Sequence, residues 1–520
     1  MDKIIVTNRA ALGKKYGKGM ARIERALDKL VQADQRRGLA TQVVAMDIAQ
    51  DMAPCGAAVV TDAGSCQQVK NAIDAIYAKY HPDYLLILGG PDIVPHQQLP
   101  NPAYDPDGDD DKFVPSDLPY ACEAGFSAKP KDFLGPTRVV GRLPDLLGAG
   151  DAAYLVRLLG TAARWKSRSR GEFMRYFAIS AEEWEDSTEL SVEKLFGSTE
   201  RLNISPPLGP KWPPAQLASR IHFINCHGGS SDPHFYGQPK GEEQYPIAHS
   251  ASRLPGKISN GTVVAAECCY GAQIYDPGDS RGQSGICSTY LADGAYGFFG
   301  SSTTSYGPSE GNGQADLICQ YFISAVLNGA SLGRATLEAR HRFAQAYTHL
   351  DPTDLKTILQ FHLLGDPSIH PIAAAPHSLS RTKTYKTAFK QKQNVAGLRA
   401  LRRERITQVG VSLQQSLGAV VPAGGEAPKE IIGLLKAAAK ESGLGVGAGN
   451  IRVFGVQYGK GAKAHEMRAF ESARSGRMVY SLTAKVPGKQ SARHPHRRVL
   501  GLIATVQGGQ LIHLRRVHSR

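Results

Sequence analysis

The sequence predicts an α/β protein, with a doubly wound, mostly parallel sheet flanked by helices and a smaller basic α+β domain after it. Two observations predict the sheet. The first 90 residues alternate strand-like and helix-like patterns, as parallel strands joined by crossover helices do. Two later runs, Ile221–Cys226 and Thr262–Ala266, are short and apolar, which is typical of strands buried on both faces. A change of charge along the chain predicts the second domain.

The other elements of the body follow from the same patterns. Residues 91–135 are rich in Pro, Gly and Asp and are expected to be irregular. We therefore expect an N-terminal α/β subdomain over residues 1–135 and a second unit, which contains the two apolar runs, over residues 136–375. The strands are predicted at Lys3–Thr7, Thr41–Asp47, Tyr84–Leu88, Arg138–Gly141, Met174–Ser180 and Ala295–Phe299, and the helices at Met20–Gln35, Cys66–Tyr80, Ala149–Trp165, Gln314–Asn328 and Leu332–Tyr347.

Residues 376–520 are predicted to form the separate basic domain. They hold 26 Lys and Arg but only 6 Asp and Glu, whereas the whole chain carries a net charge of +14, so the body before them is acidic. A domain of this charge could bind an anionic partner, either nucleic acid or an acidic protein. Alternatively, it could bind the acidic body and regulate it. The predicted elements are a helix at Lys429–Lys440 and strands at Ile451–Val456, Met478–Val486, Val499–Val506 and Gln510–Val517, the last two joined by a Gly508-Gly509 hairpin turn.

Composition narrows the class of protein. An apolar content of 42% indicates a globular chain, and no apolar run reaches the length of a membrane span. Eight cysteines are scattered without a CxxC pair, which favours reduced thiols over disulfides or a zinc site. The first residues, Met1–Thr7, enter a strand pattern without a signal-peptide layout, so we expect a cytoplasmic protein.

Two reactive side chains follow the two apolar runs. His227-Gly228 ends the first, and Glu267-Cys268-Cys269 ends the second. Parallel strands deliver such groups to one edge of a sheet, where a thiol and a histidine can form a nucleophile–base pair. This is the chemistry of a cysteine peptidase, and the backbone N–H groups of Gly228 and Cys269 are candidates for binding the oxyanion.

Several stretches resemble known enzymes. The body is similar to the caspase-like (clan CD) cysteine peptidases, and most closely to the gingipain family, over about residues 80–372. The resemblance implies a caspase-like fold, a Cys–His dyad and a protein or peptide substrate, with no cofactor required. It rests on Leu85–Pro95 with Ser116–Tyr120, on Val139–Pro144, on His227-Gly228, on Glu267–Gly271, and on Phe361–Ser368 with its LLGDPS sequence.

Either cysteine of the pair is a candidate nucleophile. Counting from Cys269 gives an acidic residue two places before and Gly two places after, as in caspases and legumains, whereas counting from Cys268 places Gly271 three residues later, as in gingipains. Strand alternation sends the two side chains to opposite faces, so only one can meet His227. We favour Cys269. The alternative to an active enzyme is a catalytically silent caspase-like scaffold that binds nucleic acid or a protein partner.

Specificity and metal binding are further expectations from the resemblance. The resembled peptidases cut after Arg, Lys or Asn, and we predict cleavage after a basic residue, which needs a carboxylate in the pocket. The resembled enzymes also bind calcium, for which a run of aspartates offers weak candidates. The carboxylate candidates are Glu267, Asp117, Glu182, Glu183, Glu185 and Asp186, and the calcium candidates are Asp105, Asp107 and Asp109.

Overall fold

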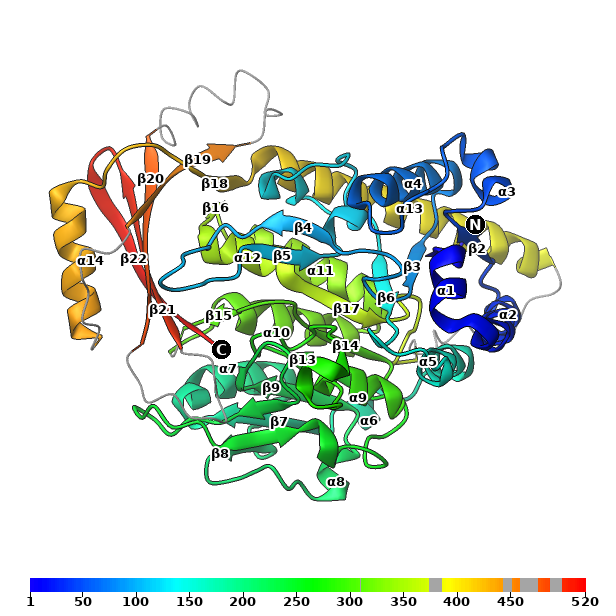
Figure 1. Ribbon diagram of the computed structural model, residues 1–520, viewed down its shortest axis with the longest axis horizontal. Coiled ribbons are helices and arrows are strands. Elements are labelled where there is room, and N and C mark those ends of the chain that lie inside the picture. Colours follow the sequence, from blue (N-terminus) through cyan, green and yellow to red (C-terminus); the bar gives the residue numbers. More distant parts are fainter. Residues whose placement is uncertain (309, 374–385, 443–450, 459–475, 487–497) are drawn as a thin grey trace.

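A ten-stranded sheet forms the centre of the computed structural model, which describes residues 1–308, 310–373, 386–442, 451–458, 476–486 and 498–520 (Figure 1). The strand order is β2-β1-β3-β6-β17-β14-β13-β9-β7-β8. Neighbouring strands are parallel except β14 and β17, which are antiparallel. The sheet therefore consists of two parallel halves that point in opposite directions. The strands are β1 Lys3–Thr7, β2 Thr41–Ala45, β3 Tyr84–Leu88, β6 Val140–Leu143, β17 Phe361–Gly365, β14 Gly297–Ser301, β13 Val263–Ala266, β9 Ile221–Asn225, β7 Tyr176–Ala181 and β8 Leu202–Ser205.

Helices flank this sheet as the doubly wound prediction requires. From β7 the chain moves outward to β8, and it then returns past β7 to β9, β13 and β14. Because crossovers between parallel strands are right-handed, this change of direction puts the helix after β7 and the helix after β13 on opposite faces of the sheet. Accordingly α10 packs against α7 and α11, while α2 packs against α5 and α5 against α9. The helices are α1 Arg9–Tyr16, α2 Met20–Arg36, α3 Ala49–Met52, α4 Cys66–Tyr80, α5 Ala153–Arg164, α6 Arg170–Phe173, α7 Glu185–Phe196, α8 Pro214–Leu217, α9 Ile286–Ala292, α10 Gln314–Leu327, α11 Leu332–Gln345 and α12 Pro352–Gln360.

The predicted boundary at residues 135/136 is crossed by this sheet. Strand β6 pairs with β3 of the first half, and β17 returns from the end of the body to pair with β6. One apolar core runs through both halves. Residues 1–135 and 136–375 are thus parts of one folded body rather than separately packed units.

Two of the motifs that carry the family resemblance form buried ion pairs inside this body. Arg142, from the Val139–Pro144 stretch, donates to both carboxylate oxygens of Asp117 at 2.8 and 2.6 Å. Asp366, from the LLGDPS stretch, pairs with Lys3, which also donates to Asp34 at 2.9 Å. Removal of one partner from such a buried pair leaves an uncompensated charge, so these residues serve the fold.

A second, seven-stranded sheet forms the C-terminal domain, with the order β15-β22-β21-β20-β19-β18-β16. Its two edge strands, β15 and β16, belong to the body, so the domain is attached to the body along both edges (Figure 1). Helix α14 covers one face over a small apolar core. The elements are β15 Tyr306–Gly307, β16 His349–Leu350, α13 Lys386–Ser416, β18 Gly418–Pro422, α14 Lys429–Glu441, β19 Arg452–Tyr458, β20 Arg477–Lys485, β21 Val499–Gln507 and β22 Gln510–Ser519.

The predicted elements of this domain agree with the structure, including the hairpin turn. Gly508 and Gly509 both adopt positive φ (57° and 81°), as a two-residue turn between β21 and β22 requires. The predicted boundary at 375/376 lies outside the described residues. Within the described part of the chain, no helix is long and apolar enough to cross a membrane.

Candidate active site

Four neighbouring strands end at one edge of the sheet and carry the candidate catalytic residues. Strands β7, β9, β13 and β14 are parallel, so the segments after them share that edge. Segment 182–184 follows β7, His227 follows β9, Cys269 follows β13, and residues 302–305 follow β14. The topology therefore brings the two predicted reactive groups to neighbouring positions.

Main-chain groups of Arg520 and Ser305 contact Cys269. Its N–H donates to the main-chain carbonyl oxygen of Arg520 at 3.2 Å. Its Sγ accepts from the N–H of Ser305 at 3.3 Å. The next residue, Tyr270, has a φ of 54°, a left-handed conformation that a bulky side chain rarely adopts. Backbone strain of this kind is typical of functional sites.

The two cysteines of the pair face different surroundings, as strand alternation predicts. Cys268 is fully buried, and its Sγ–H points to the carbonyl of Ile224 on β9 at 3.8 Å. Burial raises its pKa well above the ordinary value, with a smaller contribution from Cys226. Cys268 is therefore a core residue, whereas the Cys269 thiol lies on the side where Ser305 and Arg520 meet.

His227 is positioned by an amide rather than by a carboxylate. Its Nε2 lies 2.7 Å from Oε1 of Gln238. The amide nitrogen of Gln238 donates to the carbonyl of Glu242 at 2.6 Å, which fixes the amide orientation and makes Nε2 of His227 the donor. In the neutral ring this leaves Nδ1 to accept a proton. The imidazole also packs on Trp184 and Tyr245, with ring centroids 4.2 and 4.8 Å away.

Gly228 allows the histidine strand to approach the cysteine loop. A Cβ at this position would overlap the carbonyl oxygen of Cys269, so only glycine fits. Gly228 and Cys269 are thus in backbone contact.

The guanidinium of Arg520 fills a pocket beside Cys269. Its Nη2 donates to Asp316 at 2.8 Å and to the carbonyl of Pro308 at 2.8 Å, and the group lies 4.5 Å above the ring of Trp184. Gly307 forms the wall, because a Cβ there would overlap the guanidinium. An anion, an aromatic face and a glycine wall together match the shape and charge of an arginine side chain.

Glu267 supplies a second buried carboxylate to this pocket. Neither of its carboxylate oxygens has a hydrogen-bond partner among the described residues, and the same is true of Nε and Nη1 of Arg520. Burial, followed by the nearby carboxylate of Asp316, raises the pKa of Glu267 well above its usual range, while Arg520 opposes the shift. Burial and Asp316 therefore both disfavour the charged form of Glu267, and the carboxylate that is ion-paired with Arg520 is that of Asp316.

Asp316, Trp184 and Gly307 were not among the predicted pocket residues. Trp184 lies within the acidic segment 182–186, whose pattern predicts carboxylate contacts and gives no signal for an aromatic one. Asp316 lies in the first turn of α10, where its side chain also accepts from the N–H of Gly313, so in sequence it resembles an ordinary helix-capping residue. Only folding shows that α10 points this carboxylate at the end of β22.

Comparison with known proteins now adds to this geometry. Residues 225–372 match peptidase family C25. This is the gingipain family of clan CD, so the resemblance predicted from the motifs is confirmed, and the match supports a cysteine peptidase, a hydrolase. A comparison with curated proteins gives no match. Two solved structures are similar, one described as a protease (11% identity, TM-score 0.47, 100% of this chain and 97% of that chain) and one of the Arg specific cysteine proteinase gingipain R (9% identity, TM-score 0.47, 99% and 97%).

The C25 segment contains both candidate dyad residues, while other predicted site residues lie in different surroundings. The carboxylate of Asp117 is occupied by Arg142, so we correct its predicted role in substrate binding to one in the fold. Glu183 pairs with Arg498 of the C-terminal domain at 2.9 Å. Asp186 pairs with the exposed Lys240 at 3.3 Å. Of the 182–186 segment, the residue that contacts His227 and Arg520 is Trp184.

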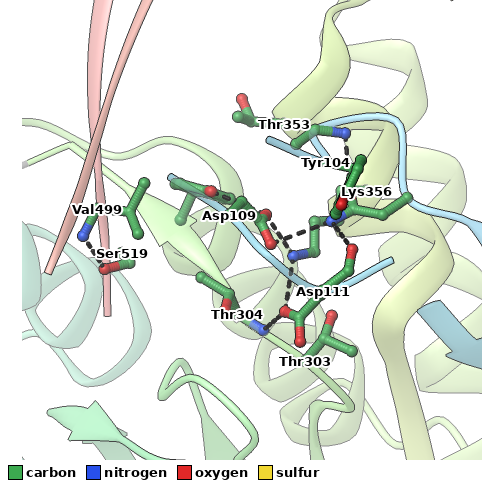
Figure 2. Close-up of polar contacts among 12 residues, drawn as sticks. Tyr104, Asp109, Asp111, Thr303, Thr304, Thr353, Lys356, Val499 and Ser519 are labelled. Atoms are coloured by element: carbon green, nitrogen blue, oxygen red, sulfur yellow. Dashed lines mark hydrogen bonds and ion pairs between the residues drawn. The ribbon is translucent and has the colours of Figure 1, made fainter. Parts of the chain in front are cut away.

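The predicted calcium loop forms an ion cluster around a lysine instead (Figure 2). Lys356 Nζ donates to Asp109 at 2.5 Å and to Asp111 at 3.3 Å. Asp105 accepts from Thr483 on β20 at 2.6 Å. Because the ammonium already neutralises Asp109 and Asp111, and Asp105 is bonded to a hydroxyl, these carboxylates do not fit a calcium ion. Within the described residues, no group of three or more His, Cys, Asp or Glu could hold a metal.

This lysine cluster supports the C25 segment next to the thiol. Asp111 accepts from the N–H of Thr304 at 3.0 Å (Figure 2). Asp109 also accepts from the hydroxyl of Tyr306 at 2.9 Å, and Asp111 from that of Tyr270 at 2.6 Å. Burial raises the pKa of Asp109 to about 6. Burial also opposes ionisation of Asp111, but Lys356 and Tyr270 outweigh it and lower that pKa. The cluster thus holds Tyr270, which follows Cys269, and the two neighbours of Ser305, Thr304 and Tyr306.

Replacing the buried lysine should strongly destabilise the protein. Lys356→Met leaves Asp109 and Asp111 without their cation, and breaking a buried pair in this way costs about 3–5 kcal/mol. Denaturant unfolding measures the loss. Lys112→Met, at an exposed lysine next to the same loop, is the matched control and should change the free energy of unfolding by less than about 0.5 kcal/mol. Equal effects of the two substitutions would contradict the cluster.

Burial of the thiol gives a pH dependence that can be measured. Burial raises the pKa of Cys269 to about 12, partly offset by the N–H of Ser305. Since only the thiolate is alkylated, the rate at Cys269 should rise about tenfold per pH unit between about pH 7 and 9.5, without a plateau. Mass spectrometry of the iodoacetamide-treated protein follows this cysteine separately from the other seven. A plateau at neutral pH would show that the thiol is already ionised in the folded chain.

Proposed function

We propose that this protein is a cysteine endopeptidase that cleaves after arginine, with Cys269 as nucleophile and His227 as general acid and base. The C25 match supports the peptidase class. The observation that carries the rest is the placement of Arg520, whose carbonyl oxygen accepts from the Cys269 N–H while its guanidinium pairs with Asp316. A substrate arginine in the same place puts its scissile carbonyl beside the thiol.

The reaction follows from these positions. His227 takes the proton of the Cys269 thiol, and Sγ attacks the carbonyl carbon that follows the arginine side chain. The carbonyl oxygen becomes an oxyanion, for which we propose the N–H of Cys269 and that of Gly228 as donors. The C–N bond then breaks, His227 protonates the departing amine, and a thioester remains on Cys269. Water, deprotonated by His227, attacks the thioester and releases the new carboxylate and the free thiol.

Preference for arginine over lysine rests on the shape of the pocket. Asp316 and the Pro308 carbonyl both accept from one guanidinium nitrogen, and the flat face of Trp184 suits a planar cation. A lysine ammonium has no planar face to stack on Trp184. An acidic side chain would meet Asp316 with like charge.

An affinity label tests this function. Purified Arg520→Ala protein, whose pocket is not filled by its own arginine side chain, is treated with peptidyl ketone probes that differ only in an Arg, Lys or Asp before the reactive group, and labelled peptides are mapped by mass spectrometry. The Arg probe should label Cys269 fastest, the Lys probe next and the Asp probe least, and His227→Ala should remove the labelling. Preference for Asp, or labelling of Cys268 in place of Cys269, would overturn the assignment.

We propose that the C-terminal domain regulates this site. Its cations pair with carboxylates of the body, which supports an intramolecular role for the basic charge. Arg498 contacts Glu183 and Glu243 at 2.9 and 3.1 Å. Arg515 contacts Asp351 and Asp354, each at 2.8 Å. Glu183 directly precedes Trp184, on whose ring Arg520 stacks, whereas Asp351 and Asp354 lie at the N-terminus of α12.

A further inference from the structure

Strand β22 enters the candidate cleft in the orientation of an extended peptide. It pairs antiparallel with β15, with Ser519 opposite Tyr306 and His518 opposite Gly307. The N–H of Arg520 then donates to the carbonyl of Ser305 at 3.0 Å. An added strand on the edge next to a nucleophile is how many proteins hold an extended peptide. In Figure 1 the red end of the chain accordingly lies beside β15 in the body.

The last residues of this strand fill the cleft completely. Val517, His518, Ser519 and Arg520 are all buried, although the residues before them on β22 are largely exposed. Cys269 beneath them is only 4% exposed. No substrate arginine can reach Asp316, and no carbonyl can reach the Cys269 N–H, while Arg520 holds both.

The surrounding contacts keep the strand in place. The N–H of Val499 on β21 donates to the Ser519 hydroxyl at 2.8 Å (Figure 2). Arg515, five residues before Arg520, is anchored by Asp351 and Asp354. The rest of β22 pairs with β21 along the hairpin. The segment is therefore attached to the C-terminal domain on one side and to the active-site edge on the other.

We propose that Val517–Arg520 is a built-in, substrate-like inhibitor, and that the protein is latent until this segment leaves β15. The inference rests on the proposed function, because it assigns Arg520 to the pocket that a substrate arginine uses. Latency is then a competition in which the tethered segment excludes peptides by its high effective concentration. Any partner that draws β22 or the C-terminal domain away from the body opens the pocket and the thiol together.

Substitution of Arg520 tests the inhibitor in the full-length chain. Arg520→Ala removes the side chain that binds Asp316, and we expect hydrolysis of an Arg-terminated fluorogenic peptide to rise at least about tenfold. Alkylation of Cys269 by iodoacetamide should rise by a similar factor. Arg516→Ala, at an exposed arginine of the same strand, is the matched control and should leave both rates unchanged. Arg520→Lys keeps a cation and should give intermediate rates.

A peptide supplied from outside separates binding from unfolding. A synthetic peptide of the sequence of residues 514–520 should inhibit the Arg520→Ala protein and protect its Cys269, whereas the same peptide with alanine in the last position should not. If Arg520→Ala changes neither hydrolysis nor alkylation, the inhibitor is wrong. If alkylation of Cys269 rises in the Arg520→Ala protein and the peptide protects this cysteine, but no substrate is cut, Val517–Arg520 still covers the site and the proposed peptidase activity is wrong. If the wild-type protein cleaves the peptide as fast as the Arg520→Ala protein does, the proposed inhibition is wrong and the proposed peptidase activity is supported.

Discussion

Cys269→Ala is expected to abolish peptide cleavage, lowering kcat/KM by at least about 10⁴-fold, whereas Cys268→Ala should leave it within about threefold. The physical reason is that the Cys269 thiol lies beside Ser305 and the carbonyl of Arg520, whereas Cys268 points into the core against Ile224. Both variants are best compared in the Arg520→Ala background, in which the cleft is open. Initial rates with an Arg-terminated peptide measure the effect.

Stability distinguishes the two cysteines a second time. Cys268 is fully buried, so Cys268→Ala should lower the free energy of unfolding by about 1 kcal/mol. Cys269→Ala removes a thiol that contacts mainly one loop, and it should cost less. Loss of activity in Cys268→Ala, measured well below its melting temperature and with Cys269→Ala active, would reverse the assignment of the nucleophile.

Asp316→Asn should have the second largest effect, and it should act on specificity. Asparagine keeps the size of the side chain and an acceptor for the Gly313 N–H but removes the anion that faces the guanidinium. Truncating one partner of a buried charge pair costs about 2–5 kcal/mol, so kcat/KM for Arg-terminated peptides should fall at least about 30-fold. Peptides ending in citrulline, which has the same shape without the charge, should be much less affected.

Glu267→Gln is the matched comparison for this pocket. Because burial and the nearby Asp316 carboxylate raise the pKa of Glu267, its protonated form is favoured and glutamine mimics that form, so kcat/KM should change by less than about fivefold. The ratio of Arg to citrulline cleavage, measured in the Arg520→Ala background, reports the two substitutions separately. If Glu267→Gln removes the Arg preference and Asp316→Asn does not, Glu267 is the anion that binds arginine, as the sequence-based prediction had it.

The acidic loop shows that the partner of a local pattern can lie far away in the sequence. The spacing of Asp105, Asp107 and Asp109 offers oxygen ligands to a cation, and the sequence suggested calcium. The cation that contacts Asp109 is the ammonium of Lys356, which lies almost 250 positions later on α12. No local pattern identifies that lysine, because its ion pairs with Asp109 and Asp111 form only when the two halves of the sheet come together. The same applies to Asp117, whose partner Arg142 lies on β6.

The sequence by itself determined the α/β class, most of the strands and helices, the resemblance to a peptidase family and the placement of His227 and Cys269 after neighbouring strands. Those features depend on hydrophobic periodicity and on short motifs, which are local. The tertiary structure alone decided that the two sheet halves run in opposite directions, that Asp316 and Trp184 line a pocket, and that Arg520 occupies it. Residues brought together from α10, the segment after β7 and the end of β22 leave no shared pattern in the sequence. Their proximity arises only when the C-terminal domain packs against the body and the last strand pairs with β15.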